Sequence, residues 1–166
     1  MKLKYLIVLI LASFAFVILF IQTKFDNITN KKTFVSTETY KTICGEYKKG
    51  EIKTGSITLP VDIADDSCKQ TLGLSGKASL NNDGMLFIFE NAGNYGFWMK
   101  DMNFPLDIIW INSNFEIVGI EKDLYPETFP KLFGQNYFAK YVLEISAGNS
   151  QKNNINIGDK IIFFKK

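Results

Sequence analysis

Residues 55 to 166 carry short apolar runs separated by polar turns, a pattern typical of β structure. From Ile57 to Ile63, apolar side chains alternate with polar residues or proline, which is the period of a half-buried strand. Because Pro60 cannot donate a ladder hydrogen bond, we expect this strand at an edge or a bulge of the sheet. Met85 to Phe89 is apolar throughout and predicts a strand buried on both faces.

The other runs complete the predicted fold. Asp65 to Ser67 favours a helix start and Gly73 a helix stop, which predicts a short helix between them. Further strands are predicted at residues 97–99, 106–111, 115–120, 141–145 and 161–164, with a hairpin turn at 112–114 and a short turn or helix near 149–153. We therefore predict an α+β fold, mostly β, in one compact domain of about seven short strands with one or two short helices.

The N-terminal segment is apolar from Tyr5 to Ile21 except at Ser13. Its seventeen residues would span about 26 Å as a helix, close to the roughly 30 Å of a bilayer core. No convincing pair of small residues follows the run, so we favour an uncleaved signal anchor. Ser13 and Ala15 leave a cleaved signal peptide as the alternative.

These patterns divide the chain into three segments. Residues 1–23 are predicted to form one N-terminal transmembrane helix, residues 24–46 a polar stem rich in Lys, Asn and Thr, and residues 47–166 the globular β-rich domain. Positive charges are almost balanced across the apolar run, but a short basic start before it is typical of export signals. We therefore expect a single-pass protein of a prokaryotic cell membrane with its domain outside the cytoplasm.

Charge and composition exclude several function classes. Residues 55–166 carry ten Lys against thirteen acidic residues, and the chain has no Arg, so nucleic acid is not an expected partner. The chain also has no His, which removes the usual general base, the commonest zinc ligand and the ordinary Ser-His and Cys-His pairs. We predict no cofactor and no metal site.

Cys44 and Cys68 are the two cysteines of the chain. In an exported domain they would often pair as a disulfide, whereas in a reducing compartment they would remain two separate buried thiols. The sequence leaves both alternatives open.

Six blocks of residues, taken together and in this order, resemble the uncharacterised prokaryotic family called domain of unknown function 192. The blocks are Gly73–Lys77, Asp83–Phe89, Phe97–Met102, Pro105–Ile108, Tyr141–Glu144 with Ala147–Gly148, and Gly158–Asp159. The resemblance covers about residues 55–166 and implies a compact β-rich domain, often exported, without an established activity. Lys77 and Thr71 depart from the family, which commonly has Arg at these positions. At position 77 a flexible lysine ammonium group therefore replaces the rigid arginine guanidinium group, with its several hydrogen-bond donors.

Trp98, Lys100 and Asp107, together with Lys77, form the predicted ligand-binding site. An aromatic floor with one charge of each sign would suit a sugar or a small zwitterion. Asp107 shares a predicted strand face with Ile109, and a buried carboxylate needs a partner, for which Lys100 and Lys77 are the candidates. The alternative is that Trp98 belongs to the core and that the charged residues occupy turns and caps.

These observations favour a non-catalytic, membrane-anchored binding or accessory module for a small solute, a polysaccharide or an envelope protein. The alternative is a cell-envelope enzyme that uses carboxylate or Lys chemistry, for which several convergent, strongly perturbed titratable groups in a cleft would be the sign. A third alternative is a module that docks a membrane protein, which an exposed apolar patch would indicate.

Overall fold

The computed structural model describes residues 42–55, 57–80 and 83–165, together with Val17, Ile18, Phe20 and Gln22. The predicted anchor and stem therefore lie largely outside the described residues. Within the described part, no helix is both long enough and apolar enough to cross a membrane. The chain divides into two compact units, Met1–Phe34 and Val35–Lys166, and the second of these contains the sheet.

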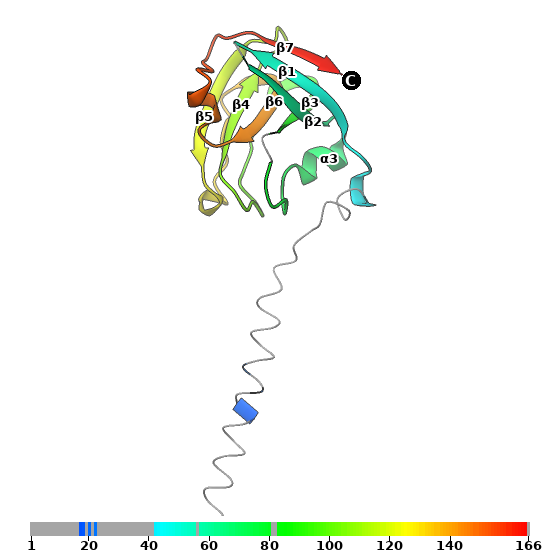
Figure 1. Ribbon diagram of the computed structural model, residues 1–166, viewed down its shortest axis with the longest axis vertical. Helices are drawn as coiled ribbons and strands as arrows, with labels where there is room; N and C mark the ends of the chain where they lie inside the picture. The colour runs from blue at the N-terminus through cyan, green and yellow to red at the C-terminus, as the bar shows by residue number, and fades with distance from the viewer. Residues whose placement is uncertain are drawn as a thin grey trace, which may run out of the picture. The chain divides into compact units, whose positions relative to one another are not determined.

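The second unit is built on a mixed seven-stranded sheet (Figure 1). In order across the sheet the strands are β5 (Ile117–Leu124), β4 (Leu106–Ile111), β6 (Phe138–Ser146), β3 (Gly84–Asn94), β2 (Ile57–Ala64), β1 (Lys48–Thr54) and β7 (Ile161–Lys165). Only the β2–β3 pair is parallel among the described strands, and helix α3 (Ser67–Leu72) lies in its connection. The described elements of this unit also include a 3-10 turn, η1 (Pro126–Thr128), and helix α4 (Asn149–Lys152).

The sheet curls until its two edges meet. The amide of Ile161, at the start of β7, donates to the carbonyl of Phe115, and the amide of Ile117 donates to the carbonyl of Asp159. This curvature encloses an inner apolar core, formed by Ile52, Val61, Leu86, Ile109, Ile111, Ile117, Leu143, Ile145, Ile155 and Ile161. Strand alternation points the intervening side chains outward.

The outer face of the sheet is also apolar and carries a second core. Its members include Met85 and Phe87 on β3, Ile108 and Trp110 on β4, and Val142 on β6. Because these side chains must also leave water, the segments between the strands cover them, contributing Leu74, Leu80, Met99, Met102 and Phe133. The fold is a mostly β domain with few short helices, as predicted.

The predicted short helix is confirmed. Helix α3 has Asp66 as its N-cap and Gly73, with a φ of 52°, directly after its last turn. The hairpin between β4 and β5 and the strands at β4, β6 and β7 are also confirmed, although β5 starts at Ile117 rather than at Phe115.

The structure differs from the predicted strands at three places near the sheet. Residues 97–99 do not form a strand, since Phe97 makes only an isolated bridge to Phe133. Strand β3 continues beyond the predicted run of Met85 to Phe89 as far as Asn94, with a register shift. Strand β1 was not predicted. Pro60 lies in an interior strand, but β3 pairs with β2 only from Val61 onward, so β2 is locally an edge at the proline.

Trp110 links the outer core to the loop that follows β3. Its buried ring donates from Nε1 to the carbonyl of Tyr95 at 2.8 Å. Gly134, with a φ of 76°, lies against this ring, and a Cβ added there would be 1.9 Å from Trp110 Cζ2. The glycine therefore allows a close approach that no other residue would allow.

We predict that Gly134→Ala strongly destabilises the domain, because the new methyl group must displace Trp110. The matched control is Gly148→Ala, whose φ of 79° gives similar backbone strain but whose Cβ would meet nothing within 4 Å. The control should lose about 1–2 kcal/mol of unfolding free energy, and Gly134→Ala about 1–3 kcal/mol more. Urea unfolding measures both, and equal losses would contradict this account of the Trp110 contact.

Candidate functional site

A pocket of about 170 Å³ opens between helix α3 and the segment after β3. Its walls are the last turn of α3 with the turn that comes after it, two aromatic residues of β3, the loop 95–98, and one residue of β6. The lining residues are Gln70, Thr71, Leu72, Gly73, Leu74, Ser75, Phe87, Phe89, Tyr95, Gly96, Phe97, Trp98, Met102 and Glu144.

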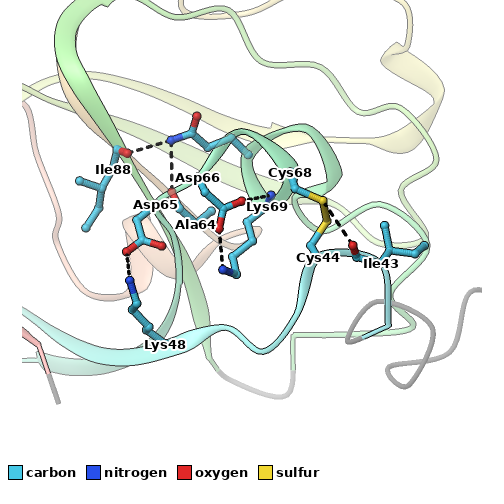
Figure 2. A network of polar contacts seen from close by, with 10 residues as sticks. Ile43, Cys44, Lys48, Ala64, Asp65, Asp66, Cys68, Lys69 and Ile88 are labelled. Atoms are coloured by element: carbon cyan, nitrogen blue, oxygen red, sulfur yellow. Dashed lines mark hydrogen bonds and ion pairs between the residues drawn. A yellow bond between two sulfur atoms is a disulfide. The ribbon is translucent and has the colours of Figure 1, made fainter.

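Helix α3 is fixed by a cap and by a side-chain clamp (Figure 2). Oδ1 of Asp66 accepts from the amide of Lys69 at 2.9 Å, and Oδ2 pairs with the Lys69 ammonium at 2.6 Å. This pairing lowers the pKa of the Asp66 carboxyl, first through the side-chain hydrogen bond. The side-chain amide of Gln70 donates to the carbonyl of Ile88 on β3 at 2.8 Å, which ties the helix to the strand that carries the pocket's aromatic wall.

Cys44 and Cys68 form a disulfide with their Cα atoms 5.5 Å apart (Figure 2). Of the two alternatives that the sequence left open, the structure therefore shows the disulfide and not two separate thiols. The bond joins the segment before β1 to the first turn of α3. It closes a loop across 24 positions of sequence, which in the chain-entropy model stabilises the fold by about 3 kcal/mol. The disulfide therefore holds the helix that forms one wall of the pocket.

Aromatic rings form the opposite wall. The rings of Phe89 and Tyr95 stack with centroids 3.5 Å apart, and Phe97 meets Phe87 edge-to-face at 4.9 Å. Reciprocal backbone hydrogen bonds between Phe97 and Phe133, of 3.0 and 2.8 Å, hold the loop in place. This wall is therefore preorganised by the outer core.

Glu144 is the buried acid of the pocket. On β6 it lies opposite Met85 of β3 and Ile108 of β4, so both cross-strand neighbours are apolar. The residue is 5% exposed, and its Oε2 atom has no hydrogen-bond partner among the described residues. Buried carboxyl oxygens are normally hydrogen-bonded, so this one is available to a bound molecule.

Burial raises the pKa of the Glu144 carboxyl from an ordinary 4.5 to about 8. The positive charge of Lys77 opposes the shift without cancelling it. Lys77 itself is engaged elsewhere, since its ammonium pairs with Asp62 at 3.2 Å. At neutral pH the pocket therefore presents a neutral carboxylic acid, which can donate one hydrogen bond and accept others.

The residues of the predicted site are partly brought together. Trp98 lines the pocket, is 49% exposed and packs its ring edge-to-face with Phe129 at 5.6 Å. The Lys100 ammonium lies 5.7 Å from the Trp98 ring centroid, outside the lining. Lys77 is not among the lining residues either, although Glu144 senses its charge.

Asp107 lies apart from that group, on the inner face of the sheet. Its carboxylate accepts from the amides of Asp123 at 2.9 Å, Gly148 at 3.2 Å and Ser150 at 2.9 Å, and from the Ser150 hydroxyl at 2.7 Å. The expected pairing with Lys100 or Lys77 is therefore wrong. Asp107 is fully buried and joins β4 to the end of β5 and to the start of α4.

Glu144 was not among the site residues predicted from the sequence. The signal was a single acid inside the apolar run from Tyr141 to Ile145, at a position whose neighbours Leu143 and Ile145 belong to the inner core. Alternation should have placed Glu144 on the same face as Val142, where a strand covered on both faces would bury it. Without knowing that β6 is a central strand, one would interpret the acid as an ordinary solvated residue.

A family model described as "Uncharacterized ACR, COG1430", domain of unknown function 192, matches residues 50–163. The chain belongs to this family. The match confirms the resemblance drawn from the six sequence blocks and extends it to part of β1.

Solved structures similar to this member of the domain of unknown function 192 family include the following two. A "putative transcription regulator" from Sinorhizobium meliloti 1021 has a TM-score of 0.68 and 26% identity, covering 71% of this chain and 95% of its own. A protein of unknown function from Novosphingobium aromaticivorans DSM 12444 has a TM-score of 0.63 and 24% identity, covering 72% of this chain and 87% of its own, and shows the fold alone. No curated protein shows a significant match.

We predict that Asp107→Asn destabilises the domain by about 2–4 kcal/mol. The side-chain nitrogen of Asn cannot accept the hydrogen bonds that backbone N–H groups donate to the Asp107 carboxylate. The matched control is Asp101→Asn, since Asp101 is exposed and its φ of 55° suits Asn well. Urea unfolding should show a large loss for the first variant and almost none for the second. An Asp107→Asn protein as stable as the parent would contradict the structural role.

We predict that Glu144→Gln changes the pH dependence of stability. Because the folded state holds the Glu144 proton up to a pKa of about 8 and the unfolded state releases it near 4.5, unfolding releases a proton between these values. The parent should therefore lose about 1 kcal/mol of stability per pH unit between about pH 5 and pH 8, relative to the variant. The exposed carboxyl of Glu90 supplies the control Glu90→Gln. Parallel stability curves for the parent and Glu144→Gln would contradict the raised pKa.

Proposed function

We propose that this domain is a non-catalytic binding module that holds a small solute in the pocket beside Glu144. The single observation that carries the proposal is the Oε2 atom of Glu144, which lacks a partner among the described residues and lies within an aromatic-walled pocket. A domain selected for stability alone would favour an apolar residue between Met85 and Ile108, because an unsatisfied buried polar atom costs about 1–3 kcal/mol. A ligand that pairs with this atom would recover that cost.

The pocket's size favours a small solute over a polysaccharide or a protein. A volume of about 170 Å³ corresponds to roughly five or six water-sized groups. Trp98 at the opening offers a half-exposed aromatic face that a ligand could cover.

We further propose that the domain works outside the cytoplasm, attached by the segment 1–23 as a single-pass anchor. The Cys44–Cys68 disulfide supports this, because disulfides persist in oxidising compartments and are rare in the cytosol. The apolar run from Tyr5 to Ile21 supports an anchor or an export signal.

The alternative is a cell-envelope enzyme in which Glu144 acts as a proton donor. Its raised pKa, near the working pH, is the observation that favours this function. General acid–base catalysis would also need a second reactive group, and among the described lining residues Glu144 is alone in having a strongly shifted pKa. Binding without turnover is therefore the leading proposal.

The Sinorhizobium protein is described as a "putative transcription regulator", but the charge of this chain argues against DNA binding. Residues 55–166 are net acidic and contain no Arg, whereas DNA binding requires a concentration of positive charge on one face. We propose no regulatory role on DNA.

The test is a thermal-shift screen of the oxidised, full-length protein against neutral sugars, amino acids, amines and small carboxylates. A ligand of this pocket should raise the melting temperature of the parent, because binding to the folded state stabilises it. The shift should shrink in Trp98→Ala, which removes a pocket wall, and persist in Phe164→Ala, which removes a similarly exposed ring on β7. No shift with any compound would overturn the proposal, and consumption of the ligand would favour the enzyme.

A further inference from the structure

The chemistry of the pocket also indicates which class of solute it takes, an inference that rests on the binding function proposed above. Glu144 supplies one buried carboxyl group, and the described lining residues include no lysine. An anionic ligand would therefore enter a largely buried pocket with no cation in the described lining to compensate its charge. We therefore expect the ligand to be neutral or cationic.

The walls of the pocket favour a cation. Rings of Tyr95, Phe97 and Trp98 line it, and the faces of such rings attract positive charge. The opposite wall includes the last turn of α3, whose backbone carbonyl oxygens are hydrogen-bond acceptors. Both walls therefore contain groups of a kind that can stabilise a positive charge in the pocket.

The nearest ammonium groups lie outside the pocket lining and contact other residues. Lys77 is the cation that Glu144 senses, and Asp62 lies between Lys77 and Lys49, paired with both ammonium groups. Lys100 lies over Trp98 rather than in the lining. With Glu144 ionised, the pocket itself would carry a net negative charge.

We propose that the pocket binds a small organic primary amine in its ammonium form, with an N–H group donating to Oε2 of Glu144 and an apolar body against the aromatic wall. An N–H group of the ligand can satisfy Oε2, which has no hydrogen-bond partner among the described residues. A quaternary ammonium ion has no N–H group and satisfies only the rings.

Binding is coupled to the loss of a proton. Before binding, Glu144 is a neutral acid and the amine is a cation; afterwards Glu144 is a carboxylate paired with the same ammonium group, and the acid proton passes to solvent. The amine keeps all of its protons. At pH 7 the reaction therefore releases about one proton per ligand, because the free Glu144 has a pKa of about 8.

The experiment uses four probes with a common ring: benzylamine, benzyl alcohol, benzyltrimethylammonium and benzoate. Isothermal titration calorimetry of the oxidised, full-length protein at about pH 7, in buffers of different ionisation enthalpy, measures affinity and proton release together. Benzylamine should bind most tightly and release about one proton. In Glu144→Gln its affinity should fall by about tenfold to a hundredfold, whereas benzyl alcohol should bind both proteins similarly. Glu116→Gln, which removes an exposed carboxylate paired with Lys160, should change nothing.

The outcomes separate this inference from the proposed function. If benzyl alcohol binds as tightly as benzylamine, the ammonium inference is overturned and the binding function stands. If benzylamine fails to bind while another compound of the broad screen shifts the melting temperature through Trp98, the inference also fails alone. If neither the probes nor the screen give any binding, the ammonium inference and the proposed binding function both fail.

Discussion

The sheet of this domain has two apolar faces, and both must be removed from water. Curling until β7 meets the start of β5 seals the inner face, and this leaves the outer face to be covered by α3 and by the segments between strands. The pocket forms where that cover is incomplete, between the last turn of α3 and the loop 95–98. Burial on both faces also explains why an acid on the central strand β6 has almost no access to bulk water.

Two buried acids show how differently the fold treats the same chemistry. Asp107, on the inner face, receives hydrogen bonds from three backbone amides and one hydroxyl, and so serves the architecture. Glu144, on the outer face, has an oxygen without a partner among the described residues and a pKa raised to about 8. The first acid is fully satisfied within the chain. The second would be satisfied by a molecule that enters the pocket, and the functional proposal therefore rests on it.

Local patterns predicted most of the elements, and tertiary context decided the rest. The capping chemistry of Asp66 and Gly73 placed α3 correctly, because caps are local. Strand β1 was missed because lysines and a glycine break its apolar pattern, and its place between β2 and β7 depends on pairing across the chain. For the site, Trp98 was predicted from its sequence neighbours, whereas Glu144 needed the register of three strands. Asp107 was predicted to be buried, but its partners are amides that no sequence pattern marks.

The chemistry of the pocket depends on Glu144 staying protonated in the folded domain at neutral pH. The most direct measurement is a carbon-13 NMR titration of the glutamate carboxyl groups, with the Glu144 signal assigned from the Glu144→Gln variant. We expect a chemical-shift midpoint near pH 8 for that carboxyl, far above the ordinary value of 4.5. A midpoint close to 4.5 would mean that the carboxyl is solvated or paired, and would contradict both the pocket chemistry and the function built on it.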